Sequence, residues 1–318
     1  MPIPPPSSVP SRPEHTNAPV AAPALAVPFD AVVFAGGGCR CFWQLGFWQE
    51  AAPVLGLRPR VVAAVSAGAA FASAVLTDHI DQVVADFKRR TARNQRNAYP
   101  RNVLTGAPVF PHEGIYRGAL LESLNEDTWQ KLRSGPDLQI LLARPASWMG
   151  PRVGFMLGGI AFALDRRELR VHARWGERFG FCGEVVSAHG CDGPKELAEL
   201  ILQSSCTPPL LPLYRRGPRI VLDGGLIDNA PASLVAGARS TLVLLTRHYP
   251  EPELPRMPGR TYVCPSRSTP IEKWDYTSPE LIQRTFDLGR RDGEQFAALH
   301  RRSSGRDVAG AADRRWAS

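Results

Sequence analysis

The sequence has no apolar run long enough to cross a membrane as a helix. After the N-terminal part, the most apolar stretch is residues 153–164, about half of the roughly 20 residues that a bilayer requires. The chain also lacks a cationic start followed by a continuous apolar run, so it shows no Sec-type signal peptide. These absences predict a soluble, cytoplasmic protein.

Motifs for metals, other cofactors and nucleic acids are missing as well. The six cysteines include no CxxC pair and no Cys/His pattern with zinc spacing, and no clustered Asp/Glu loop is available for calcium. The arginines are scattered, without a zinc-finger, RNP or helix-turn-helix pattern. We therefore expect free thiols, no metal, no cofactor and no nucleic-acid partner. The net charge of +8 favours peripheral contact with an anionic membrane surface.

The composition is that of a globular protein, with 44% hydrophobic and 21% charged residues among 318. Residues 1–27 are rich in Pro, Ser and Ala and are expected to form a disordered leader. From residue 28, short β-rich runs alternate with helical ones, which is typical of a parallel sheet with crossover helices. We predict a three-layer α/β/α domain with a mostly parallel central sheet over residues 28–302, and a flexible tail at 303–318.

The hydrophobic pattern assigns the main elements. Strands are expected at residues 30–35, 60–65, 138–143, 169–174, 181–187, 219–222, 241–246 and 261–264. Helices are expected at residues 39–55, 67–76, 195–203 and 231–238, with a long terminal helix within 279–301. Residues 98–111 have a loop-like composition.

A glycine-rich turn follows the first expected strand, in Gly36-Gly37-Gly38-Cys39-Arg40. Glycine adopts positive φ and has no side chain in the way, so successive amides of such a turn can converge on one anion at a helix N-terminus. The turn would then hold either a phosphate or the oxyanion of an acyl-transfer intermediate.

The neighbours of this turn argue against phosphate. A dinucleotide site would have glycine at Cys41 and an acidic residue at the end of the second strand, and a P-loop would continue with GKS or GKT; the sequence has none of these. The second strand ends instead in Ser66, with Ala64 two residues before it and Gly68 two residues after it. Small residues at those positions are typical of a nucleophile elbow, although a serine there is also a common helix N-cap.

A third polar signal stands at the end of the expected strand at 219–222, where Asp223 is followed by Gly224 and Gly225. Open parallel sheets bind ligands at the carboxyl ends of their strands, and glycines let a substrate approach closely. Asp-Gly-Gly alone is also a turn signal. Three such signals at three strand ends favour one common site.

Together these motifs resemble the patatin-like phospholipases. The resemblance rests on GGGCR before a helix, the serine elbow, the DGG followed by Asn229 and Pro231, and the small-residue and proline segment at 204–209; it covers residues 29–300. It implies the patatin-like α/β/α fold and a lipid acyl hydrolase acting on phospholipids or other acyl-ester lipids.

Residue roles are implied by the same resemblance. Ser66 would attack the ester carbonyl and Asp223 would take its proton. The amides of Gly37 and Gly38 would hold the oxyanion, with Gly36 or Cys39 as further donors and Arg40 supporting the loop. The elbow and the loops would be supported by small residues, namely Ala64, Gly68, Gly224 and Gly225.

Two alternatives remain from the sequence alone. The family pattern has glycine where this chain has Ala64 and commonly where it has Cys41, which suggests a catalytically silent lipid-binding or regulatory protein. A His-based triad of an α/β-hydrolase would use Ser66, Asp223 and either His248 or His300.

The apolar segment 148–164 has two interpretations. It forms either a lid or interfacial patch, aided by Arg152, Arg166 and Arg167 near anionic headgroups, or a core helix or loop.

Overall fold

The computed structural model describes residues 29–146, 149–150, 156, 171–172 and 175–313. The expected leader and nearly all of the apolar segment 148–164, with Arg152, Arg166 and Arg167, lie outside the described residues. Within them, none of the helices combines the length and the hydropathy that a bilayer-crossing segment needs.

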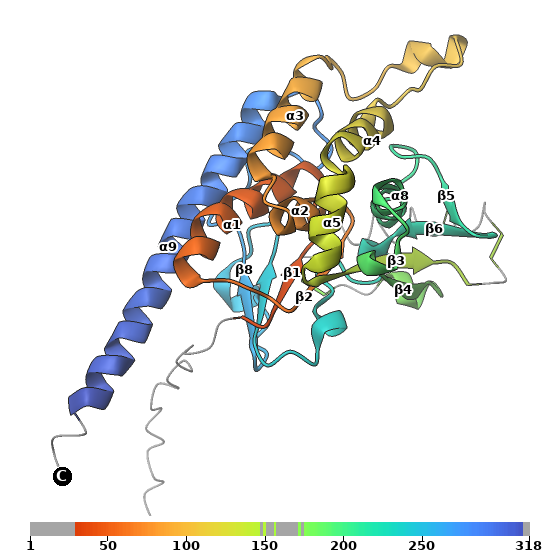
Figure 1. Ribbon diagram of the computed structural model, residues 1–318. Helices are drawn as coiled ribbons and strands as arrows, with labels where there is room; N and C mark the ends of the chain where they lie inside the picture. The colour runs from red at the N-terminus through yellow and green to blue at the C-terminus, as the bar shows by residue number, and fades with distance from the viewer. Residues whose placement is uncertain (1–28, 147–148, 151–155, 157–170, 173–174, 314–318) are drawn as a thin grey trace, which may run out of the picture.

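An eight-stranded mixed sheet forms the centre of the described domain (Figure 1). Its strands are β1 (Ala31–Phe34), β2 (Val61–Val65), β3 (Asp137–Arg144), β4 (Cys182–Ser187), β5 (Tyr214–Arg216), β6 (Arg219–Asp223), β7 (Thr241–Leu244) and β8 (Arg260–Val263). The strand order is β5-β6-β3-β2-β1-β7-β8, and β4 pairs with β3. Pairing is parallel from β3 through β2, β1 and β7 to β8, and antiparallel for β3–β4, β3–β6 and β5–β6. The predicted α/β fold with a mostly parallel sheet is confirmed.

Helices and 3-10 turns connect the strands. The helices are α1 (Phe42–Leu55), α2 (Ala67–Leu76), α3 (Ile80–Ala92), α4 (His112–Ser123), α5 (Glu126–Ser134), α7 (Trp175–Arg178), α8 (Pro194–Ser204) and α9 (Pro279–Asp313). The 3-10 turns are η1 (Gly38–Cys41), η2 (Pro100–Leu104), η3 (Ala188–Gly190), η4 (Gly224–Leu226), η5 (Ala232–Val235) and η6 (Glu251–Glu253).

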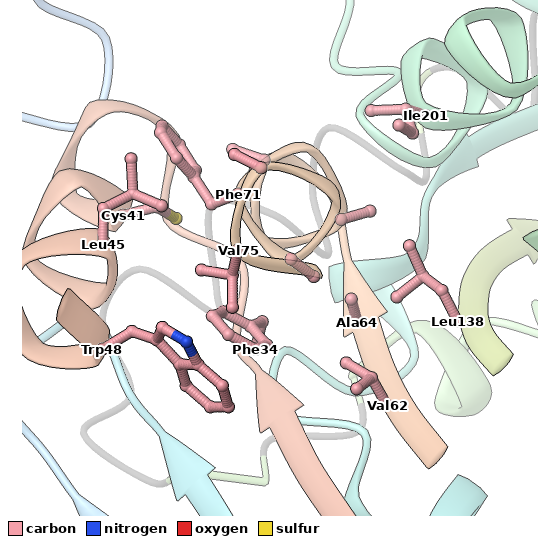
Figure 2. Packing of buried hydrophobic residues seen from close by; sticks show 14 of the residues in the cluster. Phe34, Cys41, Leu45, Trp48, Val62, Ala64, Phe71, Val75, Leu138 and Ile201 are labelled. Atoms are coloured by element: carbon pink, nitrogen blue, oxygen red, sulfur yellow. The ribbon is translucent and has the colours of Figure 1, made fainter. Parts of the chain in front are cut away.

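One face of the sheet carries the main core. Side chains alternate between the two faces of a strand, and on this face Phe34 of β1 and Val62 and Ala64 of β2 point toward α1 and α2 (Figure 2). All three are fully buried. Helix α1 is sandwiched between the sheet and α9, which runs along its outer side in Figure 1. This position explains why α1 is apolar on nearly all sides, including Trp43 and Phe47.

The opposite face has a thinner cover. Ala31, Val33 and Val243 project from this face and pack with Ala232 and Val235 of the turn η5. In the described part, this side is covered by 3-10 turns and the short helix α7, whereas the longer helices contribute to the main core. The carboxyl ends of β1 and β2 are therefore framed by loops on one side and by α2 on the other.

Most of the expected elements are confirmed, with shifts of a few residues at their ends. The expected helix at 231–238 is wrong, because successive i to i+3 hydrogen bonds, such as that from the Ala238 amide to Val235, make it a 3-10 turn. Of the expected strand at 169–174, only residues 171–172 are described, and they form a turn. Helix α9 continues to Asp313, so most of the predicted tail is helical. Helices α3, α4, α5 and α7 and strand β5 were not predicted.

Three glycines allow α1 and α9 to pack at very short distance. A Cβ atom on Gly46 of α1 would overlap the carbonyl oxygen of Phe286, and one on Gly289 of α9 would overlap that of Trp43. A Cβ on Gly293 would lie 2.5 Å from the carbonyl oxygen of Phe47. The obstacles are backbone atoms, which cannot rotate away as a side chain would.

Gly289→Ala is therefore expected to lower the free energy of unfolding by about 1–3 kcal/mol, because the two helices must separate to admit the methyl group. Gly114→Ala is the matched control, since Gly114 is exposed in α4 with open space around its Cβ position. That change should be neutral or stabilise the protein by about 0.5–1 kcal/mol. Urea unfolding would measure both, and equal effects of the two substitutions would contradict the close packing.

Candidate active site

Ser66 lies directly after β2, in the sharp turn into α2. Its φ of 55° and ψ of −138° form a conformation that residues with side chains rarely adopt. The amide of Ser66 donates to Oγ of Ser204 at 2.9 Å, and that Oγ donates to the carbonyl oxygen of Leu141 at 2.7 Å. A side chain of α8 therefore fixes the strained turn to β3. The Ser66 hydroxyl makes no capping hydrogen bond to α2, so it does not serve as a helix N-cap.

The two small residues that flank Ser66, Ala64 and Gly68, lie in different surroundings. A Cβ on Gly68 would lie 2.5 Å from the carbonyl oxygen of Phe34, so glycine is required where α2 crosses β1. Ala64 is fully buried, and its methyl group packs in the main core, where Figure 2 labels it. Of the two small positions that flank the serine, the one after it has no room for a side chain, whereas the methyl group of the alanine before it is accommodated.

Asp223 reaches Ser66 through an antiparallel strand. Val65, the last residue of β2, pairs with Leu141, and Asp223, the last residue of β6, pairs with Leu142. Strand β4 occupies the other edge of β3, so β2 and β6 share one edge and run toward each other. Asp223 ends its strand, as predicted, but this strand is one of the antiparallel members of the mostly parallel sheet, so β6 approaches from the side opposite to β2.

The two side chains are in direct contact. Oγ of Ser66 donates to Oδ2 of Asp223 at 2.8 Å, and the amide of Gly225 donates to Oδ1 at 2.8 Å. Ser66 is 3% exposed and Asp223 is 4% exposed. Burial raises the pKa of Asp223 above its ordinary value, against the opposing effects of the Lys273 charge and of hydrogen bonds from Gly225 and Ser66. A Cβ on Gly224 would overlap the carbonyl oxygen of Leu141, so only glycine allows this turn after β6.

The glycine-rich turn lies beside Ser66. A Cβ on Gly36 would stand 3.2 Å from that of Ser66 and 2.7 Å from Oδ1 of Asn229. The carbonyl oxygen of Gly36 accepts hydrogen bonds from Nδ2 of Asn229 at 3.0 Å and from Oγ1 of Thr246 at 2.7 Å. The start of the turn is therefore held in place by Asn229, which follows β6, and by Thr246, which follows β7.

Two amides of the predicted oxyanion set are occupied. The amide of Gly36 donates to the carbonyl oxygen of Asn229 at 3.0 Å, and that of Cys39 donates to the carbonyl oxygen of Lys273 at 3.0 Å. Neither points at the space beside Ser66 in this arrangement. Gly36 and Cys39 are therefore corrected from donors to residues that position the turn.

The amides of Gly37 and Gly38 differ from those of Gly36 and Cys39. They have no acceptor among the described residues. Gly38 has a φ of 56°, and a Cβ there would overlap the carbonyl oxygen of Lys273. Nε of Arg40 donates to the carbonyl oxygen of Gly37 at 3.4 Å, and burial, followed by the charge of Arg247, lowers the pKa of Arg40 to about 10.

Several contacts of the site were not identified from the sequence. Besides Ser204, Thr246 and Lys273, they include Gln44, a fully buried residue of α1. Nε2 of Gln44 donates to the carbonyl oxygens of Ala35 at 3.0 Å and Leu244 at 2.8 Å, which ties together the ends of β1 and β7. Ser204 lies in the segment that carried the family resemblance, whereas Gln44 and Lys273 had no sequence signal.

The histidines of the alternative triad lie elsewhere. His248 hydrogen bonds through Nδ1 to the carbonyl oxygen of Pro265 at 2.8 Å, and His300 through Nδ1 to that of Phe296 at 2.9 Å. Within residues 29–313, as far as they are described, no histidine hydrogen bonds to Ser66 or Asp223. The described residues also contain no group of three or more His, Cys, Asp or Glu that could hold a metal ion.

Asp223→Asn is expected to leave the melting temperature at neutral pH unchanged or higher. The raised pKa means that the fold disfavours the ionised carboxyl, a penalty present above the folded pKa and absent below the unfolded pKa. The amide keeps an acceptor for Gly225 and can donate to Oγ of Ser66. The advantage of the variant should shrink as the pH falls through the folded pKa, which thermal unfolding at several pH values would measure.

Asp275→Asn is the control, and we expect it to lower the melting temperature at neutral pH. Burial acts to raise the pKa of Asp275, but hydrogen bonds from Thr277, Ser278 and Asn97 outweigh it and leave the pKa below its ordinary value. Its ionised form therefore stabilises the fold at neutral pH, and this stability is lost as the pH falls. A lower melting temperature for Asp223→Asn than for Asp275→Asn at neutral pH would contradict the burial effect.

Comparisons with known proteins identify the family of the chain. The model of the patatin-like phospholipase family matches residues 32–236, more than half of the chain, and this range includes the glycine-rich turn, Ser66 and Asp223. The search of curated proteins found no match. The chain is similar to the crystal structure of VipD from Legionella pneumophila, at 12% identity and a TM-score of 0.42, covering 86% of this chain and 67% of that chain; so low a TM-score carries no argument. On the family match, the chain belongs to the patatin-like phospholipase family.

Proposed function

We propose that this chain is a serine lipid acyl hydrolase that cleaves acyl esters of phospholipids or related lipids with a catalytic dyad of Ser66 and Asp223. The observation that carries the proposal is the 2.8 Å hydrogen bond from Oγ of Ser66 to Oδ2 of Asp223. The amides of Gly37 and Gly38, which have no acceptor among the described residues, lie in the turn beside Ser66 and support it. Membership of the patatin-like phospholipase family supports the substrate class.

The reaction needs one proton acceptor and one oxyanion site. Asp223 takes the hydroxyl proton as Oγ of Ser66 attacks the ester carbonyl, and the amides of Gly37 and Gly38 stabilise the negative charge that forms on the carbonyl oxygen. The proton then passes to the leaving alcohol as the ester bond breaks. Asp223 next removes a proton from water, which attacks the acyl-serine, and the proton returns to Ser66 as the fatty acid leaves.

Burial makes a carboxylate usable as this base. An aspartate at its reference pKa of about 3.9 is a weak acceptor for a hydroxyl proton. Desolvation raises the pKa of Asp223 and so brings its basicity closer to what the step requires. Gly36, Cys39 and Arg40 contribute by holding the glycine-rich turn in a fixed conformation, so the donors need little reorganisation when charge develops.

The chain's departures from the family pattern do not favour a catalytically silent protein. The Ala64 methyl group packs in the main core, and Sγ of Cys41 faces the carbonyl oxygen of Ala35 at 3.6 Å. Burial raises the pKa of Cys41 to about 12, so its thiol stays protonated and does not compete as a nucleophile. Both side chains are compatible with an active Ser66.

Ser66→Ala and Asp223→Asn should each reduce hydrolysis of a phospholipid panel and of a soluble ester by on the order of 10⁴-fold, because each removes one half of the dyad. A fluorophosphonate probe should label the wild-type protein but not Ser66→Ala. His248→Ala is the control and should keep full activity. Full activity in Asp223→Asn, or loss of activity in His248→Ala, would refute the dyad.

The acidic limb of the pH profile of kcat/KM should lie above the reference aspartate pKa of about 3.9, because the reaction needs ionised Asp223 and burial raises its pKa. Activity is lost as the pH falls through that pKa. Lys273→Met should move the limb to higher pH, since the Lys273 charge lowers the pKa of Asp223. A limb that is unchanged in Lys273→Met but lost in a histidine variant would assign the base to histidine.

A further inference from the structure

The segment between α3 and α4 projects from the helical layer (Figure 1). Apolar side chains lie at its end. Val103 is 70% exposed and Leu104 is 89% exposed, the highest values among the large hydrophobic residues of the described part. The residues that follow, 105–108, are exposed as well and are small or apolar except for Thr105. We call residues 99–108 the tip.

The tip has a defined structure. The amide of Tyr99 donates to the carbonyl oxygen of Val109 at 2.7 Å, which closes the base of the tip. Nδ2 of Asn102 donates to the carbonyl oxygen of Pro108 at 2.7 Å, and the hydroxyl of Tyr99 donates to Oδ1 of Asn94 at 2.9 Å. The two apolar side chains are therefore held outward by a preformed turn, and a partner surface need not order them on binding.

The charged side chains within the segment between α3 and α4 are all basic. The sequence has no acidic residue between Asp86 and Glu113. Arg93, Arg96 and Arg101 are exposed, and none of the three forms an ion pair with another described residue. Exposed cations flanking apolar side chains are typical of elements that enter the interface of an anionic membrane. A second copy of this chain fits less well, because it also carries a net charge of +8.

Residues 94–97, which lead into the tip, are connected to the candidate active site. Nδ2 of Asn94 donates to the carbonyl oxygen of Tyr276 at 2.9 Å, and the amide of Tyr276 donates to Oδ1 of Asn97 at 2.8 Å. Three residues earlier, the carbonyl oxygen of Lys273 accepts the amide of Cys39 in the glycine-rich turn. The segment 273–276 thus contacts both residues 94–97, before the tip, and the glycine-rich turn beside Ser66.

We propose that the tip docks this protein on an anionic lipid surface, with Val103 and Leu104 entering the interface and Arg93, Arg96 and Arg101 facing the headgroups. The proposal rests on the proposed function in one respect, since the docked surface is then the source of the acyl ester. Docking itself needs no turnover, so the two are tested separately.

Flotation with vesicles of phosphatidylcholine and phosphatidylglycerol in equal parts would measure docking, in a Ser66→Ala background that prevents hydrolysis. The double substitution Val103→Ser and Leu104→Ser should weaken binding by on the order of tenfold or more, because it removes the apolar side chains that enter the interface. Leu121→Ser is the matched control, since Leu121 is 46% exposed on α4 away from the tip, and its binding should be unchanged.

The role of charge is tested by the double substitution Arg96→Gln and Arg101→Gln. It should weaken binding to the mixed vesicles roughly fivefold per arginine and have little effect on binding to pure phosphatidylcholine.

The variant with Val103→Ser and Leu104→Ser, here called the tip variant, is also tested for hydrolysis. With Ser66 restored, it should hydrolyse a soluble ester at the wild-type rate and vesicle lipid more slowly. Vesicle binding by the tip variant equal to that of Leu121→Ser would overturn the proposal. So would loss of soluble-ester hydrolysis in the tip variant. If the wild-type protein were a dimer and the tip variant a monomer, the tip would bind a second copy instead of lipid, which would also overturn the proposal. A wild-type protein that binds vesicles but hydrolyses nothing would overturn the proposed function alone.

Discussion

The meeting of β2 and β6 on one edge of β3 is the constraint on which the candidate site depends. The two strands run toward each other and end opposite Leu141 and Leu142, which places Ser66 and Asp223 at adjacent positions. Their side chains then join directly, without a histidine between them. The same geometry requires a sharp turn after each strand, which explains both the positive φ of Ser66 and the need for glycine at position 224.

Polar contacts from distant parts of the chain hold the glycine-rich turn against this strand pair. Asn229, Thr246 and Gln44 bind carbonyl oxygens at the ends of β1 and β7, and Lys273 receives the amide of Cys39. The amide of Gly36 also donates to the carbonyl oxygen of Asn229, so the amides at both ends of the turn are occupied, whereas those of Gly37 and Gly38 have no acceptor among the described residues. A fixed pair of donors beside a buried hydroxyl is the arrangement that electrostatic stabilisation of an oxyanion requires.

The burial that suits Asp223 to the proposed catalytic role also costs stability. A carboxyl whose pKa is raised by desolvation opposes folding at neutral pH, and the backbone strain at Ser66 adds to this cost. The large apolar core between the sheet, α1, α2 and α9 offsets both terms. A strained, desolvated pair supported by a rigid core is typical of sites selected for function over stability.

The sequence by itself determined the site's local parts. Glycines, small residues and the apolar strands before them identified the turn at 36–40, Ser66 and Asp223, because each needs a backbone conformation that only certain residues adopt. The helical period of Ile80, Val84 and Phe87 in α3 was also present, although no helix was assigned there. The tertiary structure alone decided the antiparallel direction of β6, the oxyanion amides that are occupied, and the roles of Ser204, Thr246 and Lys273. Hydrophobic periodicity carries no strand direction, and these contacts join residues separated by more than 100 positions, such as Ser66 with Ser204 and Gly36 with Thr246.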